Sequence, residues 1–368
     1  MTTKLILVGG FLGAGKTTLL RAAAEKLTKR GQVVGLITND QAPDLVDTAL
    51  LSAGGPSRKE RVREVAGSCF CCNFPGFIDA VSSLIDQGAQ TIIAEPVGSC
   101  TDLSATILQP LKDRYRNIAL APLTVLVDPT RLLEHLGEKP SLMDVDARYI
   151  LRLQMEEADR VLLNKIDTLS VAERGRLLGR LRASLPNVPV GGISAMTGEG
   201  LDTWLDEMFA TATAGERVVE VDYDRYAHGE AVLGWLNMVG DLRQVGTNQT
   251  WGEHARRLMN QLHGELQNRR AEIGHLKLVI ANESGQCVAN LTRLDGEVMV
   301  RDGATPSERA ELTLNARVQM SQEDLEQLTR SVLGGLPDDE VVAEIRTLRC
   351  LMPGRPTPSY RYEHVVTA

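Results

Sequence analysis

The residues Gly10–Thr17 read GFLGAGKT and fit the phosphate-loop pattern G-x-x-x-x-G-K-[ST]. Glycines in such a loop let backbone N–H groups wrap around phosphates, and the start of the following helix adds its positive dipole end. Lys16 is expected to reach the β- and γ-phosphates, and the Thr17 hydroxyl is expected to bind Mg²⁺. The residues predicted to contact the nucleotide here are Gly10, Gly13, Ala14, Gly15, Lys16, Thr17 and Thr18.

A second motif indicates which base is bound. Asn164-Lys165-Ile166-Asp167 ends an apolar run and matches the guanine-reading pattern N-K-x-D. The Asp167 carboxylate can accept two parallel hydrogen bonds from the N1–H and exocyclic amine of guanine, a pair that adenine does not offer. Asn164 can address the other edge of the base, and the Lys165 stem can lie over the ring. Farther along, Ser194-Ala195 brings a backbone N–H toward the guanine O6, so the sequence predicts GTP and GDP as ligands.

Between these motifs, Glu95 ends the apolar run TIIAEP. A carboxylate in that place holds Mg²⁺ or its water in phosphate-loop proteins. Gly98 follows three residues later and allows a switch loop to move toward a γ-phosphate. Asp40, at the end of the run QVVGLITND, is a weaker candidate for the same metal shell.

Three of the 6 cysteines lie within four positions, in Cys69-Phe70-Cys71-Cys72. Three thiolates form a soft donor set that suits Zn²⁺ or Co²⁺, and they leave a fourth position open. Cys100 is a candidate for that position, although the spacing does not require it. Two other interpretations stay open: the cysteines pack as small buried side chains, or Cys71 and Cys72 perform thiol redox chemistry.

These residues need elements that position them, and the sequence predicts an α/β fold with a mainly parallel sheet. Apolar runs alternate with helical stretches through the first part of the chain. The predicted strands are 4–10, 32–40, 91–96, 121–128, 158–167 and 188–195, and the predicted helices are 17–31, 76–88, 130–137, 147–157, 170–185 and 200–212.

After about residue 219 the pattern changes to a smaller α+β unit with a largely antiparallel sheet. Its predicted strands are 230–239, 275–281, 286–294, 296–302 and 310–318, and its predicted helices are 251–273 and 321–333. The predicted domains are therefore 1–212, a linker at 213–219, and 220–368 with an extended, proline-containing C-terminal tail.

Composition limits the class of protein further. A chain of 368 residues favours two domains, because single cores stop growing near ~250–300 residues. The net charge of −8 and the 4% of aromatic residues argue against nucleic-acid binding. No apolar run approaches the ~20 residues of a membrane span, and the N-terminal apolar run is interpreted as a strand rather than a signal peptide. We therefore expect a cytoplasmic protein with reduced thiols.

Together, GFLGAGKTT, CFCC, EPVG and NKID resemble the CobW-type metallochaperone GTPases, which are related to the HypB and UreG nickel-insertion proteins. The likeness covers residues 4 to about 210, and the stretch from Gln154 to Asp159 resembles the family pattern Q-x-x-x-A-D. The resemblance implies a GTPase in which Cys69, Cys71 and Cys72 bind a transition metal and deliver it to a client protein. It also implies nucleotide-dependent homodimers.

The chain departs from the family pattern at two places. Gly67-Ser68 replaces the usual Asn-Gly before the first cysteine, and Asn39-Asp40-Gln41-Ala42 replaces Asn-Glu-x-Gly. No arginine finger or catalytic glutamine can be named, so slow intrinsic turnover is expected.

The second domain resembles the family's smaller C-terminal domain only loosely. His228, His263 and His275 are possible additional ligands, although each is more typical of a packed or solvated histidine. Arg355 and Arg361 could contact an acidic partner. The alternative function is a GTP-responsive escort for a client such as a corrinoid or methyltransferase protein, in which the cysteine site is structural or redox-active.

Overall fold

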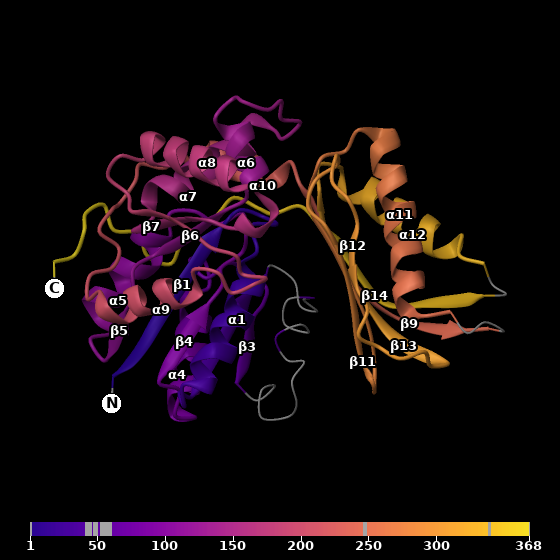
Figure 1. The fold of residues 1–368 in the computed structure, drawn as a ribbon, viewed down its shortest axis with the longest axis horizontal. Coiled ribbons are helices and arrows are strands. Elements are labelled where there is room, and N and C mark those ends of the chain that lie inside the picture. The colour runs from indigo at the N-terminus through magenta and orange to yellow at the C-terminus, as the bar shows by residue number, and fades with distance from the viewer. Residues whose placement is uncertain are drawn as a thin grey trace. The chain divides into compact units, whose positions relative to one another are not determined.

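The computed structural model describes residues 2–40, 46, 51, 61–245, 249–337 and 340–367. Their contacts divide the chain into two compact units (Figure 1). The first unit comprises Met1–Gln41, Gly54–Gly229 and Arg355–Ala368, and the second comprises Ala42–Ala53 and Glu230–Gly354. Residues 41 and 42, which belong to the predicted departure from the family pattern, lie outside the described residues.

The first unit contains a parallel sheet. Its strands lie in the order β3-β2-β4-β1-β6-β7-β8, with β5 beside the first half of β1. They are β1 (Thr3–Gly10), β2 (Val34–Asn39), β3 (Val62–Val65), β4 (Thr91–Ala94), β5 (Ile118–Leu120), β6 (Thr124–Val127), β7 (Arg160–Leu163) and β8 (Val190–Gly192). The central strands β2, β4 and β6 are buried at every residue, as expected for parallel strands covered on both faces. The predicted fold class is confirmed.

Helices connect these strands (Figure 1). They are α1 (Lys16–Lys29), α4 (Phe74–Asp86), a π-helical turn η1 (Ser104–Leu108), α5 (Gln109–Arg114), α6 (Pro129–His135), α7 (Val145–Glu157), a 3-10 turn η2 (Ile166–Thr168), α8 (Val171–Ser184), α9 (Leu201–Ala210) and α10 (Tyr223–Ala231). Local sequence explains several of their starts. In α8, the Ser170 side chain accepts from the Glu173 amide while Glu173 accepts from the Ser170 amide, which forms a capping box.

Within Glu230–Gly354, the described residues of the second unit form an antiparallel sheet with the helices α11 and α12 on one face (Figure 1). The strand order is β12-β11-β10-β13-β9-β14. The elements are β9 (Gly234–Gln244), α11 (Trp251–Arg269), β10 (Ile273–Asn282), β11 (Gly285–Leu291), β12 (Met299–Arg301), β13 (Arg309–Val318), α12 (Gln322–Gly334) and β14 (Val341–Leu351). The core between helices and sheet includes Trp251, Leu258 and Leu262 of α11, all nearly fully buried.

Several elements were not predicted. The strands β3 and β5 are short, and β3 reads VREV with two half-buried polar residues, so neither carries a strong apolar signal. The predicted strand at 230–239 begins late, because α10 continues through Ala231. The edge strand β14 has its apolar alternation interrupted by a register shift between Ile345 and Thr347.

The units differ from the predicted domains at the C-terminal tail and at residues 220–229, which both group with the parallel sheet. Residues 211–219 contain no helix or strand, and Asp159 holds them by accepting hydrogen bonds from the amides of Gly215 and Glu216 at 2.6 and 2.8 Å. The predicted boundaries stay a prediction. None of the described helices is long and apolar enough to cross a membrane.

Candidate nucleotide and thiol site

Parallel strands end at one edge of the first sheet, and the predicted site residues lie at those ends. The phosphate loop (Gly10–Thr17) follows β1, Asp40 follows β2, Glu95 follows β4 and Asn164 follows β7. In open α/β sheets this carboxyl edge is where ligands bind. The sheet therefore gathers residues that are far apart in the sequence.

The phosphate loop has a backbone that requires its glycines. Gly10, Gly13 and Gly15 have φ values of 131°, 78° and 96°, in the region that L side chains rarely adopt. A Cβ on Gly10 would also lie 2.5 Å from the Leu126 carbonyl oxygen. Gly15 is the residue before α1, so the loop ends at a helix N-terminus, where backbone N–H groups are available to phosphate.

Lys16, Thr17 and Glu95 form one buried cluster. Lys16 Nζ donates to the Gly10 carbonyl at 2.9 Å and lies 3.8 Å from Glu95 Oε1. The Thr17 hydroxyl donates to the same Glu95 oxygen at 3.1 Å. A hydroxyl and a carboxylate in contact are hard oxygen donors of the type that Mg²⁺ prefers, so these residues fit that ion. Asp40 is also buried, and its amide donates to the Val65 carbonyl.

Gly98 closes the switch loop (Glu95–Gly98) onto the phosphate loop. A Cβ on Gly98 would lie 2.7 Å from Leu12 Cδ2 and 3.0 Å from Lys16 Nζ. The buried Gln154 side chain holds the backbone beyond it, because its Nε2 donates to the carbonyls of Gly98 and Cys100 at 3.0 and 2.7 Å. In the sequence, Gln154 was recognised only as part of a family pattern, and the structure shows what this side chain contacts.

The predicted base-reading residues also meet. Asn164 Nδ2 donates to the Ala14 carbonyl at 2.7 Å, and Asn164 Oδ1 accepts from the Ala195 amide at 3.0 Å. Asn164 therefore bridges the phosphate loop and the Ser194-Ala195 turn. Ser194 is fully buried, and its hydroxyl accepts from the Thr197 amide, whereas Asp167 is exposed at η2 and its carboxylate is accessible to a ligand.

Asp128 is a residue of this site that sequence reasoning missed. It ends β6, caps α6 by accepting from the Thr130 amide at 2.9 Å, and accepts from Lys165 Nζ at 2.6 Å. The ion pair fixes Lys165, whose φ of 58° is itself unusual for a residue with a side chain. The signal was present, because the predicted strand 121–128 also ends in a carboxylate.

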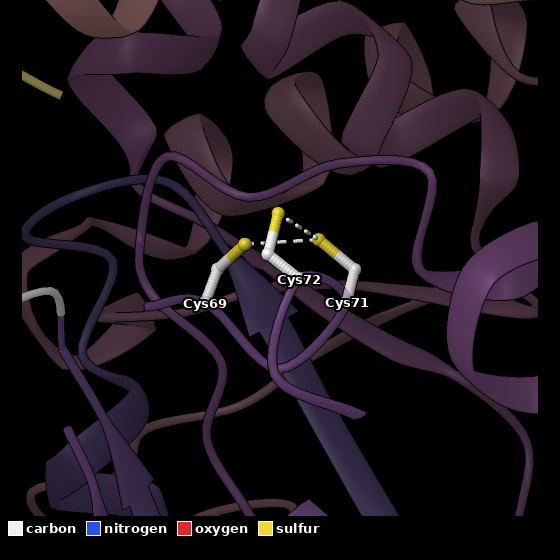
Figure 2. Close-up of side chains that lie close together, drawn as sticks. All are labelled: Cys69, Cys71 and Cys72. Atoms are coloured by element: carbon white, nitrogen blue, oxygen red, sulfur yellow. Dashed lines mark hydrogen bonds between the residues drawn. The ribbon is translucent and has the colours of Figure 1, made fainter. Parts of the chain in front are cut away.

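The thiol loop (Cys69–Cys72) gathers three sulfur atoms. Figure 2 shows the Sγ atoms of Cys69, Cys71 and Cys72 converging, with separations of 2.9 Å between the first two and 3.8 Å between the last two. All three ligand atoms lie within 4.8 Å of one another. Cys69 and Cys71 are buried and Cys72 is half-buried, so the cluster has one partly open side.

Asn39, at the end of β2, holds the thiol loop in place. Its Nδ2 donates to the carbonyls of Val65 and Ser68, both at 2.8 Å, and its Oδ1 accepts from the Phe70 amide at 2.9 Å. Asn73 then caps α4 by accepting from the Gly76 amide. Two asparagines therefore fix the thiol loop, and one of them, Asn39, belongs to the strand β2.

The pKa values of the three thiols are shifted in different directions. A side-chain hydrogen bond from Cys100 is the largest cause that lowers the pKa of Cys69, and bonds from Cys71 and Cys72 add to it. Hydrogen bonding to Cys69 is in turn the largest cause that raises the pKa of Cys71 and of Cys72. Cys100, which comes from the segment that follows the switch loop, therefore affects the Cys69 thiol, but its sulfur is not one of the three that lie within 4.8 Å of one another.

The histidines named from the sequence have local partners. His228 Nδ1 lies 2.9 Å from Asp146 Oδ2, whose other oxygen pairs with Arg225 at 2.8 Å. Asp144, Asp146 and His228 form a second group of residues whose potential ligand atoms lie close together. The ion pair with Arg225 and the helix cap made by Asp144 explain why these side chains gather there. His263 Nε2 contacts the Leu294 carbonyl at 2.8 Å, and His275 is buried in β10.

Two curated proteins are similar to part of this chain. The zinc chaperone CobW of Pseudomonas aeruginosa is 29% identical over 205 residues, covering 49% of this chain and 53% of that protein. The zinc chaperone YjiA of Escherichia coli is 29% identical over 192 residues, covering 49% and 55%. The chain thus spans about half the length of the curated relatives it matches.

Among solved structures, Zn(II)-bound YjiA GTPase from E. coli aligns with 92% of this chain and 100% of its own, at 17% identity and a TM-score of 0.36. Residues 4–190 match the CobW/HypB/UreG nucleotide-binding domain. Because that match covers just over half of the chain, and because it includes the phosphate loop, the thiol loop and Asn164–Asp167, this protein belongs to the CobW/HypB/UreG family.

Proposed function

We propose that this protein is a cytoplasmic GTPase that carries Zn²⁺ on the thiol loop and delivers it to a client protein in step with its nucleotide state. The observation that carries the proposal is the convergence of three sulfur atoms within 4.8 Å. Both curated relatives are named zinc chaperones, which favours Zn²⁺ as the cargo, with Co²⁺ as the alternative. A nucleotide-dependent homodimer is part of the same proposal.

The donor set suits a cargo ion better than a permanent one. Three cysteines bind Zn²⁺ well, whereas structural zinc sites are closed by a fourth protein ligand. Cys100 is our candidate for a fourth donor that is present in one nucleotide state, because its thiol already bonds to Cys69. Since the pKa values of Cys71 and Cys72 are raised, loading of the ion must displace their protons.

On the nucleotide side, we propose GTP with Mg²⁺. Asp167 is exposed and free to accept from guanine, and Asn164 positions the loops on either side of it. Thr17 and Glu95 would hold Mg²⁺, with Asp40 as a weaker candidate in the same shell. When bound, Mg²⁺ neutralises charge on the phosphates. The chain's own contributions are the Lys16 ammonium and the loop amides, which stabilise charge on the transferring phosphoryl group.

Coupling between the two sites follows the chain from Glu95 to Cys100. Gly98 lies against Lys16, and Cys100 is two residues farther along and bonds to Cys69. A γ-phosphate that draws in the switch loop would therefore shift Cys100 relative to the thiol loop. The Gln154 amide nitrogen is committed to the backbone of this segment, and the sequence offers no arginine finger or catalytic glutamine, so we expect slow turnover until a partner supplies the missing group.

A competition titration tests the cargo site. The full-length protein, kept reduced, would compete for Zn²⁺ with a chromophoric chelator, beside Cys71→Ser and the control Cys350→Ser, whose cysteine lies in the second unit. We expect one tight ion in the wild type and in Cys350→Ser, and loss of tight binding in Cys71→Ser. Equal affinity in all three proteins would contradict the proposal and leave redox chemistry or packing as the role of the thiols.

A further inference from the structure

The C-terminal segment Arg355–Tyr362, here called the strap, crosses the thiol loop. It belongs to the same compact unit as the parallel sheet, although 283 residues of sequence separate Cys72 from Arg355. The strap contains no helix or strand, and its Pro356 is buried. Sequence alone predicted only an extended tail with two arginines, so this placement is new information about the site.

The strap makes three hydrogen bonds to the thiol loop. The Thr357 amide donates to Cys72 Sγ at 3.2 Å, the Ser359 amide donates to the Cys71 carbonyl at 2.8 Å, and the Ser359 hydroxyl donates to the Cys72 carbonyl at 3.1 Å. Cys72 is the member of the cluster that is only half-buried. The strap thus contacts the sulfur on the open side of the cluster.

The prolines on either side of Thr357 make this contact specific. Proline has no backbone N–H, so Thr357 carries the single amide donor within Pro356-Thr357-Pro358. Proline also restricts φ, and it biases the residue before it toward extended backbone. The segment is therefore stiff before it docks, and less conformational freedom is lost when it lies across the loop.

The other end of the strap is anchored beside the switch loop. Arg361 Nε donates to Asp102 Oδ2 at 2.8 Å, and Asp102 is 1% exposed and also accepts from the Tyr223 hydroxyl at 2.7 Å. Asp102 has a φ of 63° and lies two residues after Cys100. The Tyr360 ring packs edge-on to Phe74 with centroids 5.3 Å apart. One short segment therefore contacts both the thiol loop and the segment that follows the switch loop.

We propose that the strap is part of the cargo site: it orients and shields Cys72 through the Thr357 amide, and its anchor at Asp102 ties this contact to the switch-loop segment. The inference rests on the proposed function, because it assigns the strap to the release of the same ion. An N–H donor to a ligand sulfur is an outer-shell contact, and loss of such a contact typically changes metal affinity about 10–100-fold.

Two substitutions at one position isolate the hydrogen bond. Thr357→Pro removes the amide donor and extends the proline run, whereas Thr357→Ala keeps the amide and removes only the side chain. For each full-length protein we would measure the rate at which Zn²⁺ is lost to an excess of chelator. In the metal-free protein, we would measure the rate at which iodoacetamide alkylates Cys72, located by mass spectrometry.

We expect Thr357→Pro to release Zn²⁺ about tenfold faster than the wild type and to alkylate faster at Cys72, and Thr357→Ala to behave as the wild type does. Both variants should keep the wild-type melting temperature and GTP affinity. A third variant removes the strap by ending the chain at Gly354, with Asp102→Asn to neutralise the buried carboxylate. It should release the ion at least as fast as Thr357→Pro.

Equal rates for Thr357→Pro and Thr357→Ala in both assays would overturn the inference. Failure of the proposed function has a different signature, because the wild type itself would then show no Zn²⁺ binding that depends on Cys71. The alkylation arm needs no metal, so it still decides whether the strap shields Cys72 in that case.

Discussion

At the scale of single residues, amide side chains carry much of the site's geometry. Asn164 joins the phosphate loop to the Ser194-Ala195 turn, and Asn39 joins β2 to the thiol loop. An amide offers a donor and an acceptor on one short side chain, so it satisfies backbone groups from two segments at once. The motif N-K-x-D predicted a role for Asn164, whereas Asn39 was noted only as the first residue of the family pattern Asn-Glu-x-Gly, with no role assigned to its side chain.

Under the proposed function, Asp167 is the residue that we expect to select guanine over other bases. Replacing it by asparagine should lower the affinity for GTP about tenfold or more, because one hydrogen bond to a charged group contributes ~1.5–3 kcal/mol. The same variant should bind xanthosine triphosphate more tightly than the wild type does, because xanthine carries a carbonyl where guanine carries its amine. Fluorescence titration with both nucleotides measures this. Weaker binding of both would indicate damage to the fold and contradict the assigned role.

At the scale of elements, the short segment after β4 connects the two sites. Its backbone contacts the phosphate loop at Gly98, is held by Gln154 of α7, and continues into Cys100 and Asp102. The phosphate loop, α7 and the thiol loop thus all contact this one segment. Its position is therefore sensitive to changes at any of the three.

Gly98→Ala tests this close approach. The added Cβ would lie 2.7 Å from Leu12 Cδ2 and 3.0 Å from Lys16 Nζ, so either the loop or the lysine must shift. We expect about tenfold weaker GTP binding, since overpacking costs ~1–3 kcal/mol. Gly179→Ala is the control, because a Cβ on this exposed residue of α8 meets nothing within 4 Å. It should leave GTP binding unchanged and stabilise the helix slightly. Equal GTP affinities in the two variants would argue against the packing described.

Glu157, at the end of α7, gives the protein a pH-dependent stability. Burial is the main cause that raises its pKa to about 8, and the Asp102 charge adds to the rise. In an unfolded chain the pKa is ~4.3, so between these values the folded protein holds a proton that the unfolded one has lost. The free energy of unfolding should therefore fall as pH rises from ~4.3 to about 8, by at most ~1.4 kcal/mol per pH unit.

Glu157→Gln should remove this contribution, because the amide oxygen can accept from the Ser104 amide while the amide nitrogen donates to the Thr101 hydroxyl oxygen, without a charge. Denaturant unfolding at several pH values measures the slope. Glu156→Gln is the matched control, since it removes the same charge from the same helix at a surface ion pair with Arg152. If the control flattened the profile as much as Glu157→Gln did, the buried carboxyl would not be its cause.

At the scale of the whole molecule, the sequence predicted those elements that have a strong local pattern of apolar residues or a recognisable loop motif. Apolar runs predicted the central strands β1, β2, β4, β6 and β7, and the loop motifs predicted the ligand-facing ends of those strands. Short or half-polar strands such as β3 and β5 lacked that signal. The strap could not be predicted, because a proline-rich tail that docks reads the same as one that is solvated, and its contact with Cys72 spans 285 positions.

The division into two units leads to one expectation about a client protein. The long segment Glu230–Gly354 of the second unit is joined to the first unit at both of its ends, and the strap begins at the second of these junctions. We expect a client that binds the second unit to influence the strap through this covalent connection.

In the proposed function, the nucleotide state sets how tightly the thiol loop holds its ion. The most direct test is the Zn²⁺ affinity of the full-length protein with Mg·GTP, with Mg·GDP and without nucleotide, beside Cys100→Ser. We expect the Zn²⁺ affinity of the wild type to differ between the GTP and GDP states. Cys100→Ser should reduce this difference and leave the affinity for GTP unchanged. Identical Zn²⁺ affinity in all three nucleotide states of the wild type would contradict it.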